Sequence, residues 1–329
     1  MESSSLPPAP ARLVHARGVP AFGMYQGRIE TLSWQRLKAP TAKRLTRRLH
    51  HKRWQYAGIA HTRFFVGLAI VDAGWTSAAF AYLFDRDTRQ VAASASANGL
   101  PGTARLESRP FGTARFRHRR LTLDWAREGE RLVLAVDAPG LCLAAHVHLP
   151  ADAPVMAAIA PANWLAHSTH KTGALEISGF VDTGRARYSL DGAHASLDAS
   201  DGLLARNTAW QWASAHRPDI GFNLQAGFMG DAENALWIDG ELFRAGAAHF
   251  NFEQTDPMRP WTIRTDDGCL DLVFTPEGMR REDRNYWLAA SRYVQPVGTF
   301  SGTVVHPLTG ARRWVEGLTG VTEDHASRW

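Results

Sequence analysis

Apolar and polar residues alternate with a period of two over much of the first half of the chain, the pattern of half-buried β-strands. Short turn sequences separate the runs, for example at residues 72–74 (DAG) and 85–87 (DRD). The runs recur about every 8–12 residues, as in barrels and sandwiches. The pattern predicts an antiparallel meander with strands within residues 63–75, 77–91, 114–126, 131–140 and 141–149.

The alternation returns after a Pro/Ala-rich connector at residues 150–171. Asp-Gly pairs at residues 239–240 and 267–268 lie between alternating runs and predict tight hairpins. We expect the domain boundary at the connector. The expected organisation is a disordered segment at residues 1–20, an N-terminal barrel-like domain at 21–170 and a C-terminal barrel-like domain at 171–329.

One stretch departs from the strand pattern. Leu45 and Leu49 are four residues apart among Arg and Lys side chains, which predicts a short amphipathic helix at residues 41–54. Its basic face either binds anions or a membrane surface, or is a helix face exposed to solvent. The solvated face is favoured, because no aromatic residues are interleaved with the charges.

Trp210 and Trp212 are separated by one residue, so their side chains share one face of a strand. After a short break, apolar residues recur at every second position from Phe222 to Phe228. We expect a hairpin whose aromatic residues form one wall. The wall belongs either to an ordinary barrel core or to a cavity for an apolar ligand, since each buried aromatic removes about 150–250 Å² from water.

Polar residues accompany this wall. Asn223 and Gln225 alternate with the apolar set, and such amides can orient a carbonyl or hydroxyl group of an apolar ligand. The alternative is exposure to solvent or hydrogen bonding within a turn. Lys52 and Trp54 share a strand face and are expected to close or plug one barrel mouth. The predicted ligand-binding residues are Trp210, Trp212, Arg206, Asn223, Gln225, Lys52 and Trp54.

Composition narrows the class of protein. The 329 residues are 45% hydrophobic and 21% charged, as in globular proteins, and the net charge of +5 is too small to indicate a nucleic-acid partner. The longest apolar run, residues 64–71, is far shorter than the roughly 20 residues of a membrane span, so no stable membrane insertion is expected. Cys142 and Cys269 are expected to be buried free thiols. With no signal-peptide pattern, these features predict a cytoplasmic protein.

Metal and cofactor sites have little support. His146 and His148 form one closely spaced pair and His167 and His170 another, but neither pair has a third ligand at a suitable spacing. The chain contains no GxSxG, Walker A or GxGxxG motif. We therefore predict no metal and no cofactor.

The order of residues between Gly173 and Trp212 resembles that of tandem-lipocalin-like proteins, which include the AttH-like proteins and the carotenoid 1,2-hydratases. Their shared glycine–aspartate box corresponds to residues 192–202, with Ala195 in place of the usual Trp and Ala199 in place of the usual His. Beyond residue 20 most of the chain resembles still more closely the family called domain of unknown function 2804. The motifs in common are Lys52/Trp54, Arg206/Thr208/Trp210/Trp212/Ala213, Gly221 to Leu224, Glu233/Asn234, His249/Phe250 and Glu323/Asp324/His325/Trp329.

The resemblance implies an all-β fold of two lipocalin-like (calycin-like) antiparallel β-barrel halves in tandem, with few short helices. It implies no settled activity. It also places Asp198 at the aspartate position of the box.

Three residues are candidates for proton transfer. Desolvation near an aromatic wall would favour the neutral form of the Asp198 carboxyl, which suits a general acid that protonates an alkene. The competing explanation is ordinary turn chemistry in the DASDG sequence. Glu323 and His325 share a face if they lie on a strand, and such a pair can pass a proton. Here the alternative is an exposed tail.

Two functions therefore remain open. One is binding of a hydrophobic small molecule, lipid- or isoprenoid-like, in a Trp-lined cavity. The other is a cofactor-independent hydratase, isomerase or cyclase with Asp198 or Glu323 as general acid. An enzyme should place Asp198, Glu323 or His325 inside the cavity, whereas a carrier should have an apolar lining with charges only at the rim.

Overall fold

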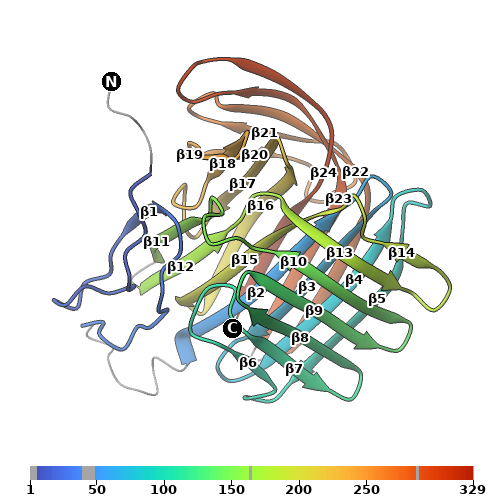
Figure 1. Cartoon of the computed structure of the whole chain (residues 1–329), viewed down its shortest axis with the longest axis horizontal. Coiled ribbons are helices and arrows are strands. Elements are labelled where there is room, and N and C mark those ends of the chain that lie inside the picture. The colour runs from blue at the N-terminus through green and yellow to red at the C-terminus, as the bar shows by residue number, and fades with distance from the viewer. Residues whose placement is uncertain (1–5, 39–48, 163–164, 287–288, 329) are drawn as a thin grey trace.

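A computed structural model describes residues 6–38, 49–162, 165–286 and 289–328. The chain folds almost entirely into strands, all of which pair antiparallel within two sheets (Figure 1). The first sheet contains β1 (Gly23–Gln26), β2 (His51–Ala60), β3 (Phe64–Asp72), β4 (Ser77–Asp85), β5 (Gln90–Gly99), β6 (Ala104–Leu106), β7 (Ala114–His118), β8 (Leu121–Glu128), β9 (Arg131–Ala138), β10 (Leu141–His148), β11 (Met156–Ala162), β12 (Leu165–Lys171), β13 (Leu175–Asp182), β14 (Arg187–Ser189) and β15 (His194–Leu203).

The first sheet curls into a nearly closed barrel. Its main strand order is β5-β4-β3-β2-β15-β13-β10-β9-β8-β7-β6, and β12, β11 and β1 extend it from β15. Leu68 of β3, Trp125 of β8 and Val181 of β13 are far apart in this order but share one buried core. Strict alternation produces this core, because every second side chain of a strand such as β8 points inward.

The second sheet forms a half-barrel. Its order is β19-β18-β17-β16-β24-β23-β22-β21-β20. Phe222 and Phe300 pack edge to face in its core, with ring centroids 4.9 Å apart, and Trp261 is fully buried beside them. The strands are β16 (Asn207–Arg217), β17 (Ile220–Gly227), β18 (Ala235–Ile238), β19 (Glu241–Arg244), β20 (Ala248–Asn251), β21 (Trp261–Thr265), β22 (Leu270–Tyr286), β23 (Ala289–Val305) and β24 (Arg312–Arg328). The prediction of an all-β fold with two curled antiparallel halves and almost no helix is confirmed.

The chain passes from one sheet to the other at residues 204–206, later than the boundary expected at residue 170. The Pro/Ala-rich connector is largely sheet, since it contains β11 and β12. β13 and β15 follow it and return to the first sheet, where β13 pairs with β10 and β15 pairs with β2. The composition of the connector suggested a linker, but its backbone hydrogen bonds are satisfied within the first sheet.

Two N-terminal expectations differ from the structure. Leu13 and Val14 lie in the segment expected to be disordered, yet both are buried in a small core with Trp34. Apolar cover beside β1, β11 and β12 orders residues 6–20 (Figure 1). Most of the helix predicted at residues 41–54 lies outside the described residues. The portion from His51 onward is wrong as helix, because it belongs to β2 and pairs with β15.

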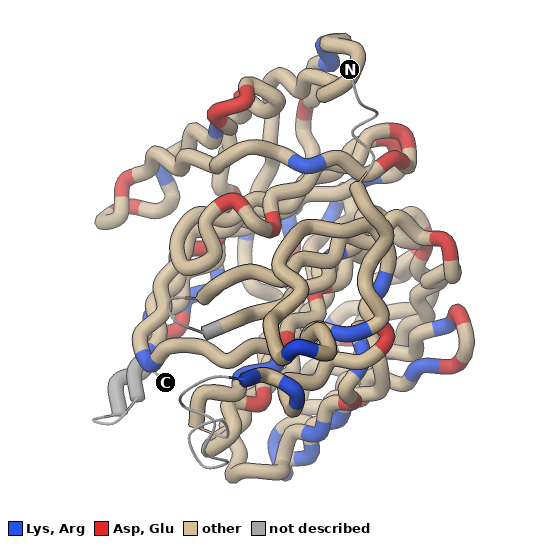
Figure 2. Tube along the Cα trace, turned by 90° about the vertical axis from the view of Figure 1, so that its left-hand side faces the viewer, with Lys and Arg blue, Asp and Glu red and all other residues tan. Residues whose placement is uncertain are grey.

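Surface features also bear on the expectations. Cys142 is exposed, so its predicted burial is wrong, whereas Cys269 is buried as expected. Cys142 lies on β10 at a position whose side chain points away from the barrel core. Charged residues of both signs are spread over the turns and outer strands (Figure 2). Within the described part of the chain, no helix has the length and apolar character needed to cross a membrane.

The two sheets are joined by packed aromatic residues and by buried polar contacts. Tyr82 of the first sheet donates a hydrogen bond of 2.5 Å to Gln295 of the second. Arg86 donates two hydrogen bonds of 2.7 Å to the Glu277 carboxylate, which lies at a β-bulge in β22. These contacts hold the two sheets together around the space between them.

Candidate functional site

A cavity of about 120 Å³ lies between the two sheets. Strands β2, β3, β4, β12 and β15 of the first sheet and β16, β17, β23 and β24 of the second contribute side chains to it. The described lining residues are Trp54, Tyr56, Ala69, Val71, Phe80, His167, Lys171, Asp198, Trp210, Trp212, Gln225, Phe228, Glu233, Tyr293, Glu323 and His325.

Aromatic side chains form the more exposed part of the cavity. Trp54, Phe80, Trp210 and Phe228 are each half-buried. Trp54 stacks on His167 with ring centroids 5.2 Å apart, and Trp210 lies 5.5 Å from Phe228. This arrangement gives an apolar molecule aromatic rings to contact at the more exposed part of the cavity.

The register of the β16–β17 hairpin shows that the aromatic wall expected from the sequence does not include Phe222 and Leu224. Trp212 is opposite Gln225, whereas Leu224 is opposite Ala213, so the two tryptophans share a face with Gln225 and not with Leu224. Phe222 and Leu224 point to the other face, where they belong to the core of the second sheet. The two apolar runs have the same period but opposite phase, which a hairpin's register decides.

Phe228 reaches the cavity because the alternation of side chains between the two faces of the strand shifts by one residue at Gly227. This glycine has a φ of +131°, and a Cβ at this position would lie 2.5 Å from the Ala209 carbonyl oxygen and 2.9 Å from Trp210 Cα. Both contacts are with backbone, which cannot move aside as a side chain can. Only glycine therefore fits here.

We expect Gly227→Ala to destabilise the protein by about 3 kcal/mol, from backbone strain and the steric clash together. Gly240→Ala is the matched control, because Gly240 also has a positive φ but has nothing within 4 Å of an added Cβ. The control should lose only about 1 kcal/mol. Urea unfolding of the two variants measures the difference, and equal losses would contradict the close approach of Gly227 to β16.

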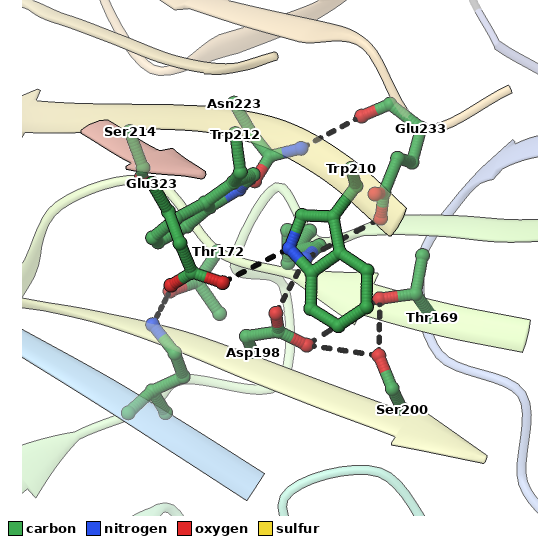
Figure 3. A network of polar contacts seen from close by, with 12 residues as sticks. Thr169, Thr172, Asp198, Ser200, Trp210, Trp212, Ser214, Asn223, Glu233 and Glu323 are labelled. Atoms are coloured by element: carbon green, nitrogen blue, oxygen red, sulfur yellow. Dashed lines mark hydrogen bonds and ion pairs between the residues drawn. The ribbon is translucent and has the colours of Figure 1, made fainter. Parts of the chain in front are cut away.

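The buried end of the cavity carries charge. Lys171 Nζ donates a hydrogen bond to Asp198 Oδ2 and lies 3.3 Å from Glu233 Oε2. Ser200 and Thr169 donate further hydrogen bonds to Asp198, of 3.0 and 3.4 Å. Lys171 and Asp198 are directly opposite on the paired strands β12 and β15. Figure 3 shows Asp198, Glu233 and Glu323 arranged around the Trp210 indole.

Burial and pairing within this cluster shift the pKa values of Lys171 and Glu233. Burial by itself lowers the pKa of Lys171, but the charges of Asp198 and Glu233 and their hydrogen bonds outweigh burial and raise it. Burial raises the pKa of Glu233, although Lys171 opposes the effect. Lys171 is therefore a fixed cation, and Glu233 holds a proton more readily than a solvated glutamate does.

Glu323 lies at the other side of the buried part of the cavity. Its Oε1 accepts a hydrogen bond of 2.9 Å from Trp210 Nε1, and its Oε2 accepts one of 3.0 Å from Gln295 Nε2. His325 Nδ1 is 3.4 Å from Glu323 Oε1. The other His325 nitrogen, Nε2, is 2.7 Å from Ser327 Oγ and 3.1 Å from Ser291 Oγ.

These contacts connect the cavity to the surface. Ser291 and Ser327 line a separate surface depression of about 470 Å³. Glu323, His325 and the two serines thus form a polar path from the buried carboxyl to that depression, in which the 3.4 Å step between Glu323 Oε1 and His325 Nδ1 is an ion-pair contact without a well-formed hydrogen bond. Such a path can carry a proton between solvent and a buried acid.

The structure brings most of the predicted site residues together. Those that line the cavity are Asp198, Glu323, His325, Trp210, Trp212, Gln225 and Trp54. Lys52, Arg206 and Asn223 lie outside the set of described lining residues. Lys52 Nζ donates hydrogen bonds of 2.7 Å to two backbone carbonyl oxygens, and Arg206 is exposed. Asn223 positions the lining, because it accepts a 2.7 Å hydrogen bond from Trp212 Nε1 and donates one to the Glu233 carbonyl.

Five polar lining residues are absent from the predicted site: Tyr56, His167, Lys171, Glu233 and Tyr293. Lys171 lies at the end of the segment interpreted as a linker, although its polar residues His167, Thr169 and Lys171 alternate as on one strand face. Glu233 belongs to a motif of the resemblance, but the motif assigns it no role. Tyr293 stands in a strand-like run with no distinguishing feature.

The histidine pairs considered for metal binding lie in different surroundings. Among the residues that the structure describes, no group of three or more His, Cys, Asp or Glu side chains is close enough to hold a metal ion. Burial and the Lys171 charge lower the pKa of His167 to about 3. Burial and the Arg28 charge do the same for the pKa of His170, whose Nε2 accepts a hydrogen bond from the Ile29 backbone NH.

These neutral histidines make stability depend on pH. The folded-state pKa of about 3 is below the unfolded value of about 6.5. The neutral imidazole therefore contributes its full stabilisation of the folded state above pH 6.5, and this contribution is lost as the pH falls towards 3. Between pH 6.5 and 5 one such histidine loses about 2 kcal/mol. We expect His170→Gln, which keeps an acceptor, to reduce the loss of stability from pH 7 to pH 5 by about that amount.

Urea unfolding at the two pH values measures the change. The exposed His15 supplies the control, because His15→Gln should leave the pH dependence as it is in the wild type. A His170→Gln variant with the wild-type pH dependence would contradict the burial of a neutral imidazole.

Comparisons with known proteins agree with this architecture. Kievitone hydratase from Nectria haematococca superposes with a TM-score of 0.55 at 10% identity, covering 100% of this chain and 98% of that one. An AttH-like protein from Nitrosomonas europaea gives a TM-score of 0.53 at 12% identity, covering 88% of this chain and 96% of that one. CghA, crystallised with Sch210972, gives 0.51 at 11% identity, covering 98% of each chain. At these identities the likeness establishes a shared fold.

No curated protein matches the chain by sequence. One family model does match, over residues 8–329, and its description is domain of unknown function. The resemblance found in the short motifs is thereby confirmed over almost the whole chain. The chain belongs to the DUF2804 family.

Proposed function

We propose that this protein is a cofactor-independent enzyme that adds or removes a proton on an apolar small molecule bound between the two sheets. Hydration of a carbon–carbon double bond and its isomerisation are the reactions of this class that the site suits best. The observation that carries the proposal is the burial of Lys171, Asp198, Glu233 and Glu323 against the same cavity.

A simple carrier of apolar molecules would not need those charges. Burying an ionised side chain opposes folding unless it is paired, and even a paired set gives little net stability. A carrier would keep charges at the rim, whereas here aromatic residues form the rim and charged residues the interior. Perturbed, buried ionisable groups in a concave site favour catalysis over storage.

We assign proton transfer to Glu323, with Asp198 as the alternative. Glu323 is favoured because His325 and Ser327 link it to the surface, so that it can regain the proton it gives up. In a hydration, Glu323 would take a proton from the water molecule whose oxygen adds to one alkene carbon. It would then give that proton to the other alkene carbon, so that Glu323 returns to its starting state. Lys171, held by Asp198, would stabilise the negative charge that develops in between.

Two neighbouring folds support a small-molecule reaction. One is named as a hydratase and another holds a small molecule in its crystal structure. The ligand is proposed to be hydrophobic, lipid- or isoprenoid-like, because Trp54, Trp210 and Trp212 line the cavity.

Solvent labelling tests the proposal even while the substrate is unidentified. Purified protein is incubated in D2O with an apolar extract of the producing cells, and mass spectrometry follows deuterium in every compound. A hydratase or isomerase forms a carbon–deuterium bond in at least one compound, at a rate proportional to protein. If no compound gains deuterium above a boiled-protein control, the protein is a binder and the catalytic proposal fails.

A further inference from the structure

Besides the Nδ1 atoms of His167 and His325, three polar side chains in the cavity lack partners of their own. The Tyr293 hydroxyl, the Tyr56 hydroxyl and both amide atoms of Gln225 have no well-formed hydrogen bond among the described residues. All three side chains line the cavity, and their exposed fractions are only 8%, 8% and 1%. A buried polar group without a partner destabilises the folded state, so such groups mark positions that a ligand or water completes.

The two phenols are available as donors. Burial raises the pKa of Tyr56 and of Tyr293 well above the usual value, and the negative charge of Glu323 raises both further, so each keeps its proton. Gln295 lies near the Tyr56 oxygen as a hydrogen-bond donor, which leaves the Tyr56 hydrogen without an acceptor. The cavity therefore offers O–H hydrogens to a ligand oxygen.

The charges of the cavity exclude an anionic ligand. Lys171 is the one cation among the described lining residues, and it is already paired with Asp198 and Glu233. Three carboxyl groups, those of Asp198, Glu233 and Glu323, line the same cavity as this single lysine. Arg280 packs over Phe80 at 4.1 Å from the ring centroid, but it is outside the lining and pairs with Glu282. A carboxylate entering this space would be repelled and left without a counter-ion.

We infer that the cavity selects an uncharged apolar molecule that carries a carbonyl oxygen, bound by the hydroxyls of Tyr293 and Tyr56, and that it rejects carboxylates such as free fatty acids. The inference rests on the proposed function and names the substrate class of that site. A carbonyl held by two O–H donors is polarised, and polarisation of a conjugated double bond would assist proton transfer at Glu323.

Three probes of nearly equal shape separate the contribution of the carbonyl oxygen from the effect of a negative charge. Acetophenone carries the carbonyl oxygen, α-methylstyrene replaces that oxygen with a methylene group, and benzoate replaces the methyl group with a charged oxygen. The probes are limited to a single ring because the cavity measures about 120 Å³, and an engineered cavity of about 150 Å³ takes up benzene. Equilibrium dialysis at pH 7.5 gives the dissociation constant of each probe.

The variants are Tyr293→Phe and Tyr56→Phe, which remove one hydroxyl each and keep the ring. We expect each to weaken acetophenone binding about tenfold and to leave α-methylstyrene binding within about twofold, as loss of one hydrogen bond predicts. Benzoate should bind the wild type at least about 100-fold more weakly than acetophenone. Tyr25→Phe is the control, because the Tyr25 hydroxyl bonds the Ala21 carbonyl away from the cavity.

The inference is overturned if both Phe variants weaken the ketone and the hydrocarbon equally, or if benzoate binds as well as acetophenone. Absence of binding by all three probes overturns it as well. Failure of the proposed function gives a different result, because solvent labelling would then be negative while the selectivity for the ketone remained.

Discussion

Lys171→Met is expected to destabilise the protein by about 3–5 kcal/mol, because it leaves Asp198 and Glu233 buried without their cation. Lys171 and both carboxylates are almost inaccessible to solvent, with side-chain exposures of 7%, 12% and 6%. Water therefore cannot replace the missing charge without opening the interface between the sheets. Urea unfolding at pH 7 measures the effect.

Two companion variants make the result specific. Neutralising the carboxylates as well, in Lys171→Met/Asp198→Asn/Glu233→Gln, should recover most of the lost stability, since no unpaired charge then remains. Arg264→Met breaks an exposed ion pair of similar length, 2.8 Å to Asp271, and should change stability little. If Lys171→Met costs no more than Arg264→Met, the cluster is not the buried ionic group described here.

Glu323→Gln is expected to slow deuterium incorporation from D2O by about 10²–10⁴-fold, the usual contribution of a general acid. The amide keeps the shape of the side chain but supplies no exchangeable carboxyl proton. It can retain only one of the two hydrogen bonds from Trp210 and Gln295, so acetophenone binding is measured in parallel to separate chemistry from folding. Glu316→Gln, an exposed position on the same strand, is the matched control.

The polar path to the surface adds a second readout. His325→Gln should slow turnover, and added imidazole should restore part of the rate, because a diffusible base can replace the missing ring. A purely structural histidine would show no such rescue. An unchanged rate in Glu323→Gln would shift the assignment to Asp198, and an unchanged rate in variants of both residues would remove the acid–base mechanism.

The neighbouring folds place these predictions in context. The fold is shared with a protein named as a hydratase, yet residues cannot be carried over at 10–12% identity. The site proposed here therefore rests on this chain's own contacts. Among those contacts, the Lys171 ammonium lies 5.7 Å from the Trp212 ring centroid and Glu323 accepts a hydrogen bond from the Trp210 indole, so both charged groups lie against the same pair of tryptophans.

Alternation alone was enough to predict the fold class. Side chains of a strand point to opposite faces in turn, so an apolar face every second residue commits a segment to a sheet with one buried side. The same argument placed Trp210 and Trp212 together on one face. It also placed Glu323 and His325 on one face of β24, where both line the cavity.

The tertiary structure alone decided which of these faces meet. A period of two fixes the rhythm of a strand but not its phase relative to its partner, so the face of Phe222 and Leu224 was assigned wrongly until the hairpin register was known. Lys171, Asp198 and Glu233 come from three segments whose contacts no local pattern encodes. Only the curling of the first sheet against the second brings their charges into one buried space, where burial and pairing give them chemistry that the same residues would not have in water.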